Sequence, residues 1–502
     1  MSIIKKQALL STIFSYGGVV IGFITQFFVV PNVLSESQNG LLGVLLSYMY
    51  VLVQLSSLGF NAAGSRFFPY FRDSSKGHRG FLFLGLSSGL IGFLVSMLGL
   101  FMLKDWLVNS QEKSNLFADN FHFLIPITFA TLLFNLFDNY AKNLYDTVTG
   151  TFLSQFLQKL LFLISLLLLV FKYIEFEQYL YFWALAISFY VVPMIWKASR
   201  LDGFSLKPDF SVFSGSFSRE FWFYSFLTIL TGFSSMVILY IDKAMLAKLT
   251  SLDETGIYNT ASFFPSVMGM ALIALNKASQ PIIAESFAKH DFGTIQSIYR
   301  KSCLTLLIIG CWIFLGIYLN IDSLFHFLPP AYSSGKWVII IISLGKLFDL
   351  ATGLNGTILT LSKYYRYDTY IMVGLILITI LLNYLLIPHY GMNGAAIALA
   401  FATIYFNLAR FGVVWWKLGM QPFSPKLLIV LFFAIITIFS IHFLPNFDDT
   451  QTFSVILAIL VRSSCLTILF GSLIYFSKIS PELNEMFNHI LKKVFYKINK
   501  NN

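Results

Sequence analysis

The sequence predicts an all-α protein that crosses a membrane many times. Of its 502 residues, 57% are hydrophobic and only 12% are charged, whereas soluble domains carry roughly 25% charged residues. The mean hydropathy is +0.74. The apolar residues form continuous segments rather than the alternating ten-residue segments of a β-barrel. Each segment is long enough to cross about 30 Å of hydrocarbon as a helix, which takes about 20 residues.

We predict about 14 spanning helices, each bounded by charged, Gly, Pro or turn-forming residues. The first follows Lys5-Lys6 and has no small-residue cleavage site at its end, so we expect it to be retained as a span. In chain order the predicted spans are 10–32, 41–65, 81–103, 119–141, 152–171, 179–198, 220–248, 256–279, 300–320, 337–361, 368–387, 393–416, 427–444 and 453–476.

Lysine and arginine are distributed unevenly over the predicted loops. With the N-terminus in the cytoplasm, several times as many of these residues fall on the cytoplasmic side as on the other side. Cytoplasmic loops are normally enriched in Lys and Arg. We therefore predict that both termini are cytoplasmic, and the net charge of +10 needs no nucleic-acid partner.

The cysteines and the patterns for phosphate or zinc binding give no indication of covalent chemistry or of a metal site. Cys303, Cys311 and Cys465 lie in apolar segments without CxxC spacing, which indicates small core residues. The patterns GxxxxGK[ST] and HExxH are absent. The longest predicted connection runs only from about 199 to 219, too short for a catalytic domain. We predict a protein that is not an enzyme and has no cofactor, with coupling to H⁺ or Na⁺ left open.

The chain contains an internal repeat. The tripeptide LFD stands at 136–138 and again at 347–349, in the fourth predicted span of each half, at an offset of 211 residues. Arg66 and Lys277 each precede a proline and are separated by the same 211 residues. Because both halves begin on the same side, we expect parallel repeats related by an axis along the membrane normal.

A turn before the second span also recurs. SESQNG at 35–40 has its counterpart in LDETG at 252–256. The repeat predicts two six-helix lobes in a parallel pseudo-twofold arrangement, followed by two further helices. The predicted domains are 1–205 (spans 1–6), 206–417 (spans 7–12), 418–477 (spans 13–14) and a basic cytoplasmic tail at 478–502.

Three stretches carry a resemblance to a known family. They are LLNYLLIPHYGMNGAAIALAFATI (381–404), YIDKAMLAKLTSLDETGIYNTA (240–261) and LSSLGFNAAGSRFFPYFRD (55–73). In this order and spacing they resemble the Wzx-type polysaccharide flippases, a branch of the superfamily that also holds the MATE drug exporters and the lipid II flippases. The pattern of six, six and two spans covers the whole chain.

The resemblance implies a flippase for undecaprenyl-diphosphate-linked oligosaccharide in the bacterial inner membrane. It implies alternating access through a cationic cavity, feeding O-antigen or capsule export. The implied partners are the lipid-linked glycan and membrane lipids, with a polysaccharide polymerase and other assembly proteins left open and no nucleic acid. A MATE-type ion-coupled drug antiporter and a lipid II flippase are the alternatives.

Asp242 and Lys243 are adjacent ionisable residues inside an apolar span. Such residues are costly in a membrane and indicate function by default. Lys243 either binds the diphosphate or a sugar acid of the substrate, or forms an ion pair between helices. Asp242 is either an ion-coupling acid or a structural one.

The remaining candidate cations are related by the repeat or by helical spacing. Arg66 and Lys277 form either a two-sided diphosphate clamp at the cytoplasmic mouth or ordinary loop charges. Lys346 and Asp349 are three residues apart and share one helix face. Asp138, the repeat counterpart of Asp349, and Asp349 itself either couple an ion or hold a polar network, and we favour the network.

Three further basic residues lie inside predicted spans. Arg462, in the last span, is a candidate for a lipid-tail groove beside the C-terminal pair of helices. Lys159 and Arg410 lie near predicted cytoplasmic ends, where long side chains extend to the interface, and we expect both to do so.

Overall fold

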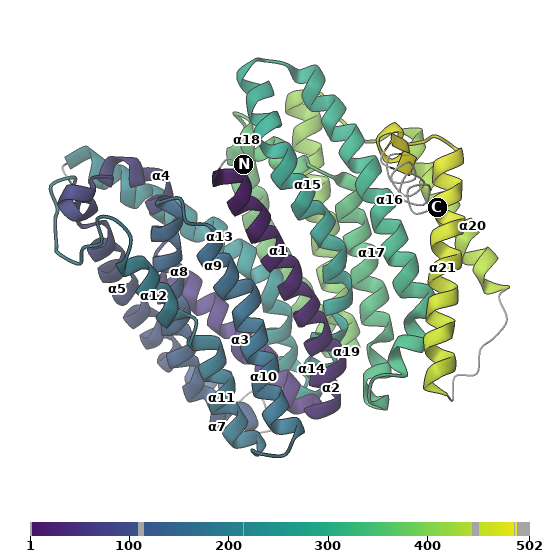
Figure 1. The fold of residues 1–502 in the computed structure, drawn as a ribbon, viewed down its shortest axis with the longest axis horizontal. Coiled ribbons are helices and arrows are strands. Elements are labelled where there is room, and N and C mark those ends of the chain that lie inside the picture. Colours follow the sequence, from purple (N-terminus) through teal and green to yellow (C-terminus); the bar gives the residue numbers. More distant parts are fainter. Residues whose placement is uncertain (1–2, 109–114, 214, 444–450, 486, 489–502) are drawn as a thin grey trace, which may run out of the picture. The chain divides into compact units, whose positions relative to one another are not determined.

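The computed structural model describes residues 3–108, 115–213, 215–443, 451–485 and 487–488. Over these ranges the chain is helical and contains no strand (Figure 1), which confirms the predicted all-α class. The predicted basic tail from 478 onward lies largely outside the described residues.

Eleven helices of the described part are long and apolar enough to cross a membrane, or 12 if the bent pair Pro330–Thr352 and Asn355–Leu361 counts as one span. The number of spans predicted from the sequence, about 14, exceeds this number for two reasons. One helix, α19 (Tyr365–Leu418), extends over two predicted spans, and α13 (Gly215–Leu249) covers the seventh predicted span without being among the 11. Each predicted span thus falls on a helix, which is consistent with 14.

The chain divides into two compact units. Unit 1 comprises Met1–Thr260 and Asn383–Gly391, and unit 2 comprises Ala261–Leu382 and Met392–Asn502. Besides α13, unit 1 holds α1 (Ile3–Phe23), η1 (Ile24–Val29), α2 (Val30–Val33), α3 (Glu36–Ser56), α4 (Phe60–Phe71), η2 (Ser74–Gly80), α5 (Phe81–Met102), α6 (Lys104–Val108), α7 (Leu116–Asn120), η3 (Phe121–Phe123), α8 (Leu124–Asn143), α9 (Val148–Thr151), η4 (Phe152–Leu157), α10 (Gln158–Val170), α11 (Phe176–Ser188), α12 (Val191–Ser199) and α14 (Leu252–Ala261).

Helix α3 begins at a capping box. The Ser35 hydroxyl accepts from the Gln38 backbone N–H at 3.3 Å, and the Gln38 side chain accepts from the Ser35 N–H at 3.0 Å. This exchange satisfies two backbone donors that the first turn leaves without partners. It fixes where the second span starts, and so sets the register of its polar residues.

The core of unit 1 is aromatic at one end of α4. Phe67 and Phe71 pack against Phe217 and Phe221 of α13, with ring centroids 5.6 to 6.2 Å apart. Aromatic pairs at such distances add attraction beyond the area they bury. The contact holds the first half of α13 to α4.

Unit 2 holds α15 (Phe263–Ala288), α16 (Phe292–Phe325), η5 (Pro330–Gly335), α17 (Lys336–Thr352), α18 (Asn355–Leu361), most of α19, α20 (Pro425–His442) and α21 (Thr452–Phe476). Helix α16 packs against α15, α17, α20 and α21. The last two helices lie together beside α16 in Figure 1.

Helix α19 has 54 residues, more than twice the length of a span. Its direction changes at Gly391, whose φ of 55° and ψ of −136° are not helical, three residues after Pro388. Glycine is the residue that adopts such a conformation without steric cost. The break separates the two spans that the sequence predicts here.

Candidate functional site

Helices α3 and α14 come into backbone contact at two glycines. A Cβ at Gly40 would overlap the Leu252 carbonyl oxygen, and a Cβ at Gly256 would overlap the Glu36 carbonyl oxygen. Only glycine permits so close an approach between helices. The two glycines end SESQNG and LDETG, the turns that the sequence pairs as counterparts.

The close contact allows short amide side chains to bridge the helices. Buried Asn39 donates to the Gly256 carbonyl and to the Thr260 hydroxyl, both at 2.9 Å. It also accepts from the Asn259 amide at 3.1 Å. The Lys243 ammonium on α13 donates to the Asn259 carbonyl oxygen at 2.7 Å. Lys243 is therefore joined to a chain of amides that runs from α13 through α14 to α3.

The Asp242 carboxylate has different hydrogen-bond partners from the Lys243 ammonium. Asp242 is 3% exposed, and its carboxylate accepts from the Tyr258 hydroxyl and from the Lys243 backbone N–H at 2.8 Å. The adjacent acid and base of α13 thus bond to adjacent residues of α14, Tyr258 and Asn259. The structure places Lys243 in an amide network instead of the side-chain ion pair that the sequence left open.

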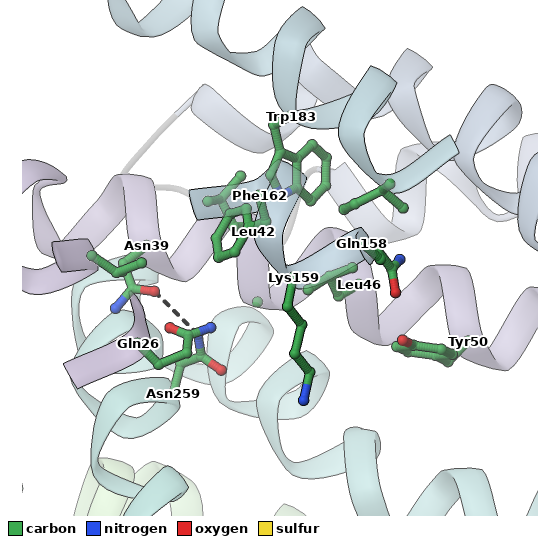
Figure 2. A pocket seen from close by; sticks show the side chains of 13 residues that line it. Gln26, Asn39, Leu42, Leu46, Tyr50, Gln158, Lys159, Phe162, Trp183 and Asn259 are labelled. Carbon is green, nitrogen blue, oxygen red and sulfur yellow. Dashed lines mark hydrogen bonds between the residues drawn. The ribbon is translucent and has the colours of Figure 1, made fainter. Parts of the chain in front are cut away.

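Unit 1 contains a cavity of about 140 Å³ that this amide chain borders (Figure 2). Its walls come from η1, α2, α3, α10, α11 and α14. It is lined by Gln26, Val30, Asn39, Leu42, Gly43, Leu46, Tyr50, Gln158, Lys159, Phe162, Trp183, Ile187 and Asn259. No acidic residue is among these described lining residues, so the cavity carries a net positive charge from Lys159.

The Lys159 side chain extends between two groups of polar side chains. Figure 2 shows Gln26 and Asn259 on one side of it, and Gln158 and Tyr50 on the other. Gln26 Oε1 is buried and has no hydrogen-bond partner in the described part of the chain. Leaving a buried acceptor without a hydrogen bond costs free energy. A ligand that donates a hydrogen bond to Gln26 Oε1 would recover that free energy, so its binding would be favoured.

Two π-helical turns, η1 and η4, flank the cavity. A π turn adds one residue to a helix, which rotates the following residues by about 100° relative to an unbroken helix of 3.6 residues per turn. Such turns are frequent at functional sites. Here η1 carries Gln26, and η4 ends directly before Gln158 and Lys159.

The glycines of span 1 allow it to pack closely on this second π turn. A Cβ at Gly18 would overlap the Gln155 carbonyl oxygen, and a Cβ at Gly22 would lie 3.5 Å from the Lys159 ammonium. The absence of a side chain at Gly18 therefore lets the two backbones come into contact.

The position of the Lys159 side chain differs from the one predicted from the sequence. It was predicted to extend to the membrane interface. In the structure it lies in the middle of the spanning helix Val148–Val170, half-buried and lining the cavity. The reason is the π turn before it, which sets the direction of its side chain.

The other predicted residues of unit 1 lie elsewhere. Arg66 is exposed on α4, with its guanidinium 4.4 Å from the ring centroid of Tyr224. Asp138 on α8 is 8% exposed, accepts from Lys142 and lies against Gly150. Neither residue lines the cavity.

In unit 2, Asp349 lies in a polar network. It accepts from the Asn407 amide at 2.9 Å and lies 3.6 Å from the Lys346 ammonium. The Asn407 carbonyl oxygen accepts in turn from Thr352 and Asn355, at 2.9 and 3.0 Å. This arrangement joins α17 and α18 to α19, and a role in ion coupling stays a prediction.

Lys277 and Arg462 also belong to unit 2. Lys277 is exposed on α15, and since Arg66 belongs to unit 1, the two-residue clamp stays a prediction. Arg462 on α21 donates to the Ser323 hydroxyl of α16 at 3.0 Å. This contact joins the last helix to α16, and a lipid-tail groove stays a prediction.

A buried ion pair connects the two halves of α19. Arg410 donates to both carboxylate oxygens of Asp368, at 2.7 and 3.1 Å. The side chains are only 15% and 9% exposed. We expected Arg410 to extend to the interface, but the break at Gly391 brings the second half of the helix back beside the first, where Asp368 is available.

Sequence reasoning missed most of the cavity. Gln26, Gln158 and Asn259 are polar residues within predicted apolar spans, and that signal was available for these three, whereas Asn39 precedes the predicted span 41–65. Their convergence depends on the glycine contacts and the π turns. In the described residues no group of three or more His, Cys, Asp or Glu residues could hold a metal ion.

Comparison with known proteins agrees with this architecture. Residues 4–287, more than half of the chain, match the family described as polysaccharide biosynthesis protein. The capsular polysaccharide biosynthesis protein CapF of Staphylococcus aureus is 22% identical over 222 residues, which cover 43% of this chain and 56% of that protein. The match thus spans little more than half the length of that relative.

Two solved structures share the fold. The lipid II flippase MurJ, in an inward closed conformation, superposes with a TM-score of 0.73 at 13% identity, over 93% of this chain and 100% of that one. An inward-facing multidrug resistance MATE family transporter of the MOP superfamily has a TM-score of 0.65 at 11% identity, over 82% and 98%. At such identities the likeness concerns the fold alone, and both are transport proteins rather than enzymes. The match over residues 4–287 shows that the chain belongs to the polysaccharide biosynthesis protein family.

Proposed function

We propose that the protein is a flippase that moves a lipid-linked oligosaccharide across the bacterial inner membrane for export of a surface polysaccharide. The observation that carries the proposal is the cavity of unit 1, where Lys159 and amide side chains line a space among apolar spans. A glycan headgroup cannot cross hydrocarbon unaided, and amides with a cation replace part of the hydration of its sugars. Family membership and the shared fold agree with this proposal.

The substrate we propose is an undecaprenyl-diphosphate-linked glycan, moved from the cytoplasmic to the outer leaflet by alternating access. Lys243 would supply positive charge through Asn259, to which its ammonium donates at 2.7 Å. The lipid tail would stay in the bilayer. A polysaccharide polymerase and other assembly proteins would receive the product, and both termini would lie in the cytoplasm.

A deletion strain tests the proposal. Lipid-linked glycan is measured by leaflet, together with surface polysaccharide, after restoration with the wild-type protein or with Lys243→Ala. We expect glycan trapped in the inner leaflet of the deletion strain to be released by the wild type and less by the variant. Normal surface glycan with raised drug sensitivity in the deletion strain would instead favour an antiporter.

A further inference from the structure

The cavity of unit 1 has the size and the lining of a site for one sugar residue. Its volume of about 140 Å³ equals that of several water molecules at ~30 Å³ each. It is smaller than the roughly 300–1,000 Å³ of pockets for drug-sized ligands. A single six-membered sugar ring is of suitable size, whereas an oligosaccharide with its diphosphate is not.

The lining provides two kinds of surface. Trp183 and Phe162 lie near one end of the cavity, and the Lys159 side chain extends away from them (Figure 2). A sugar ring has apolar C–H faces that stack on aromatic rings and hydroxyl groups that bond to amides, and the aromatic face offered here is that of half-buried Phe162, since Trp183 is only 1% exposed. The two ends of the cavity match these two parts of one ring.

The hydrogen-bonding groups that remain for a ligand are few. The amides of Asn39 and Asn259 bond to each other, and Asn259 also accepts from Lys243. By contrast, Gln26 Oε1 is buried without a partner in the described part of the chain. Lys159 and Gln158 line the same space, and no hydrogen bond of either side chain is seen among the described residues.

The charge of the lining side chains determines which ligand charge the cavity can balance. Lys159 is the one ionised side chain among the described lining residues. One ammonium balances one carboxylate, while a diphosphate carries more negative charge and would leave an excess anion in a half-buried cavity. Charge-assisted bonds from Lys to a carboxylate are also stronger than neutral ones.

We propose that this cavity is a subsite that binds one carboxylate-bearing sugar residue of the glycan, with Lys159 on the carboxylate and Gln26 and Gln158 on the hydroxyl groups. The proposal rests on the proposed flippase function and narrows its substrate class to acidic glycans. Lys159 is then a specificity-determining residue, since a neutral sugar gains nothing from its charge.

Binding to the purified full-length protein in detergent tests the subsite. The thermal unfolding midpoint is recorded against rising D-glucuronate, D-glucose or pyrophosphate for the wild type and for Lys159→Ala. Because a ligand that binds only the folded state raises the midpoint, we expect D-glucuronate to raise it and D-glucose to have a much smaller effect. Removal of the ammonium should weaken D-glucuronate binding by about tenfold or more.

Two variants control this experiment. Lys159→Arg keeps the charge and should retain preference for D-glucuronate, and it also serves if Lys159→Ala does not fold. Lys207→Ala removes an exposed lysine of the same unit and should bind as the wild type does. Equal binding of D-glucuronate by the wild type and Lys159→Ala would overturn the proposal. So would a wild-type response to pyrophosphate but not to D-glucuronate, which would assign the cavity to the phosphate.

Transport in proteoliposomes separates the subsite from the proposed function. Lipid-linked glycans with and without a uronic acid, on the same lipid diphosphate, are compared for the wild type and Lys159→Ala. Selective slowing of the acidic glycan by the variant supports the subsite. Equal rates for both glycans with both proteins would refute the subsite and leave the flippase intact. No movement of either glycan by the wild type would refute the proposed function. In that case the D-glucuronate titration would still test whether the cavity binds a carboxylate-bearing sugar.

Discussion

Asp242 and Lys243 could be identified from the sequence because ionisable residues are rare in apolar spans. Their partners could not be identified, because Tyr258 and Asn259 lie on the next helix, α14, and become neighbours only where α14 contacts α13. Lys159 was misjudged for a similar reason. The direction of its side chain depends on a π turn that no residue pattern announces.

The bond from Tyr258 to Asp242 predicts a loss of stability in Tyr258→Phe. Removing the hydroxyl leaves a buried carboxylate oxygen without its donor, and hydrogen bonds within membranes contribute about 1–2 kcal/mol. We expect the free energy of unfolding, from a detergent titration followed by circular dichroism, to fall by about that amount. Tyr70→Phe, at a side chain 62% exposed on α4, is the matched control and should change little. An equal loss in both variants would show that the bond does not stabilise α13 on α14.

The Arg410–Asp368 pair makes a second prediction at the residue scale. Asp368→Ala leaves a buried guanidinium without its partner, which costs about 3–5 kcal/mol. Replacing both residues, with Arg410→Met added, removes the unpaired charge and should restore most of that stability. The same unfolding titration checks both variants. A double variant as unstable as the single one would contradict the account of a compensated charge pair.

At the scale of helices, the positions of the spans could be predicted, because crossing hydrocarbon requires about 20 apolar residues whatever the fold. The break at Gly391, where φ and ψ are not helical, falls between the two spans predicted at 368–387 and 393–416. The sequence analysis paired SESQNG with LDETG as turns before corresponding spans, whereas in the structure residues 36–40 and 252–256 are the first helical residues of α3 and α14. That their glycines touch each other is a property of the packing.

The contact of α3 with α14 predicts that Gly40 tolerates no side chain. Gly40→Ala would force its Cβ against the Leu252 carbonyl, and overpacking typically costs about 1–3 kcal/mol. Gly99→Ala is the matched control, because a Cβ at Gly99 meets nothing within 4 Å and alanine favours the helix by about 0.5–1 kcal/mol. Unfolding titrations should show a loss for the first variant and none for the second. A stable Gly40→Ala protein would mean that the two backbones are not in contact.

At the scale of the whole molecule, composition predicted an all-α membrane protein, and the short connections left no room for a catalytic domain, while transport was implied by the family resemblance. The amide-lined cavity could not be predicted, since five separate stretches of the chain contribute to it. The match to the polysaccharide biosynthesis protein family agrees with the composition.

The most direct test of the central claim is leaflet exchange by the purified protein in liposomes. A lipid-linked oligosaccharide is placed in both leaflets, and the fraction accessible to an external glycosidase is followed with time. The account predicts that the whole labelled pool becomes accessible with the wild-type protein, while only the outer half is cleaved in protein-free liposomes. Cleavage that stops at the outer half with folded, reconstituted protein would contradict the claim that this chain flips lipid-linked glycan.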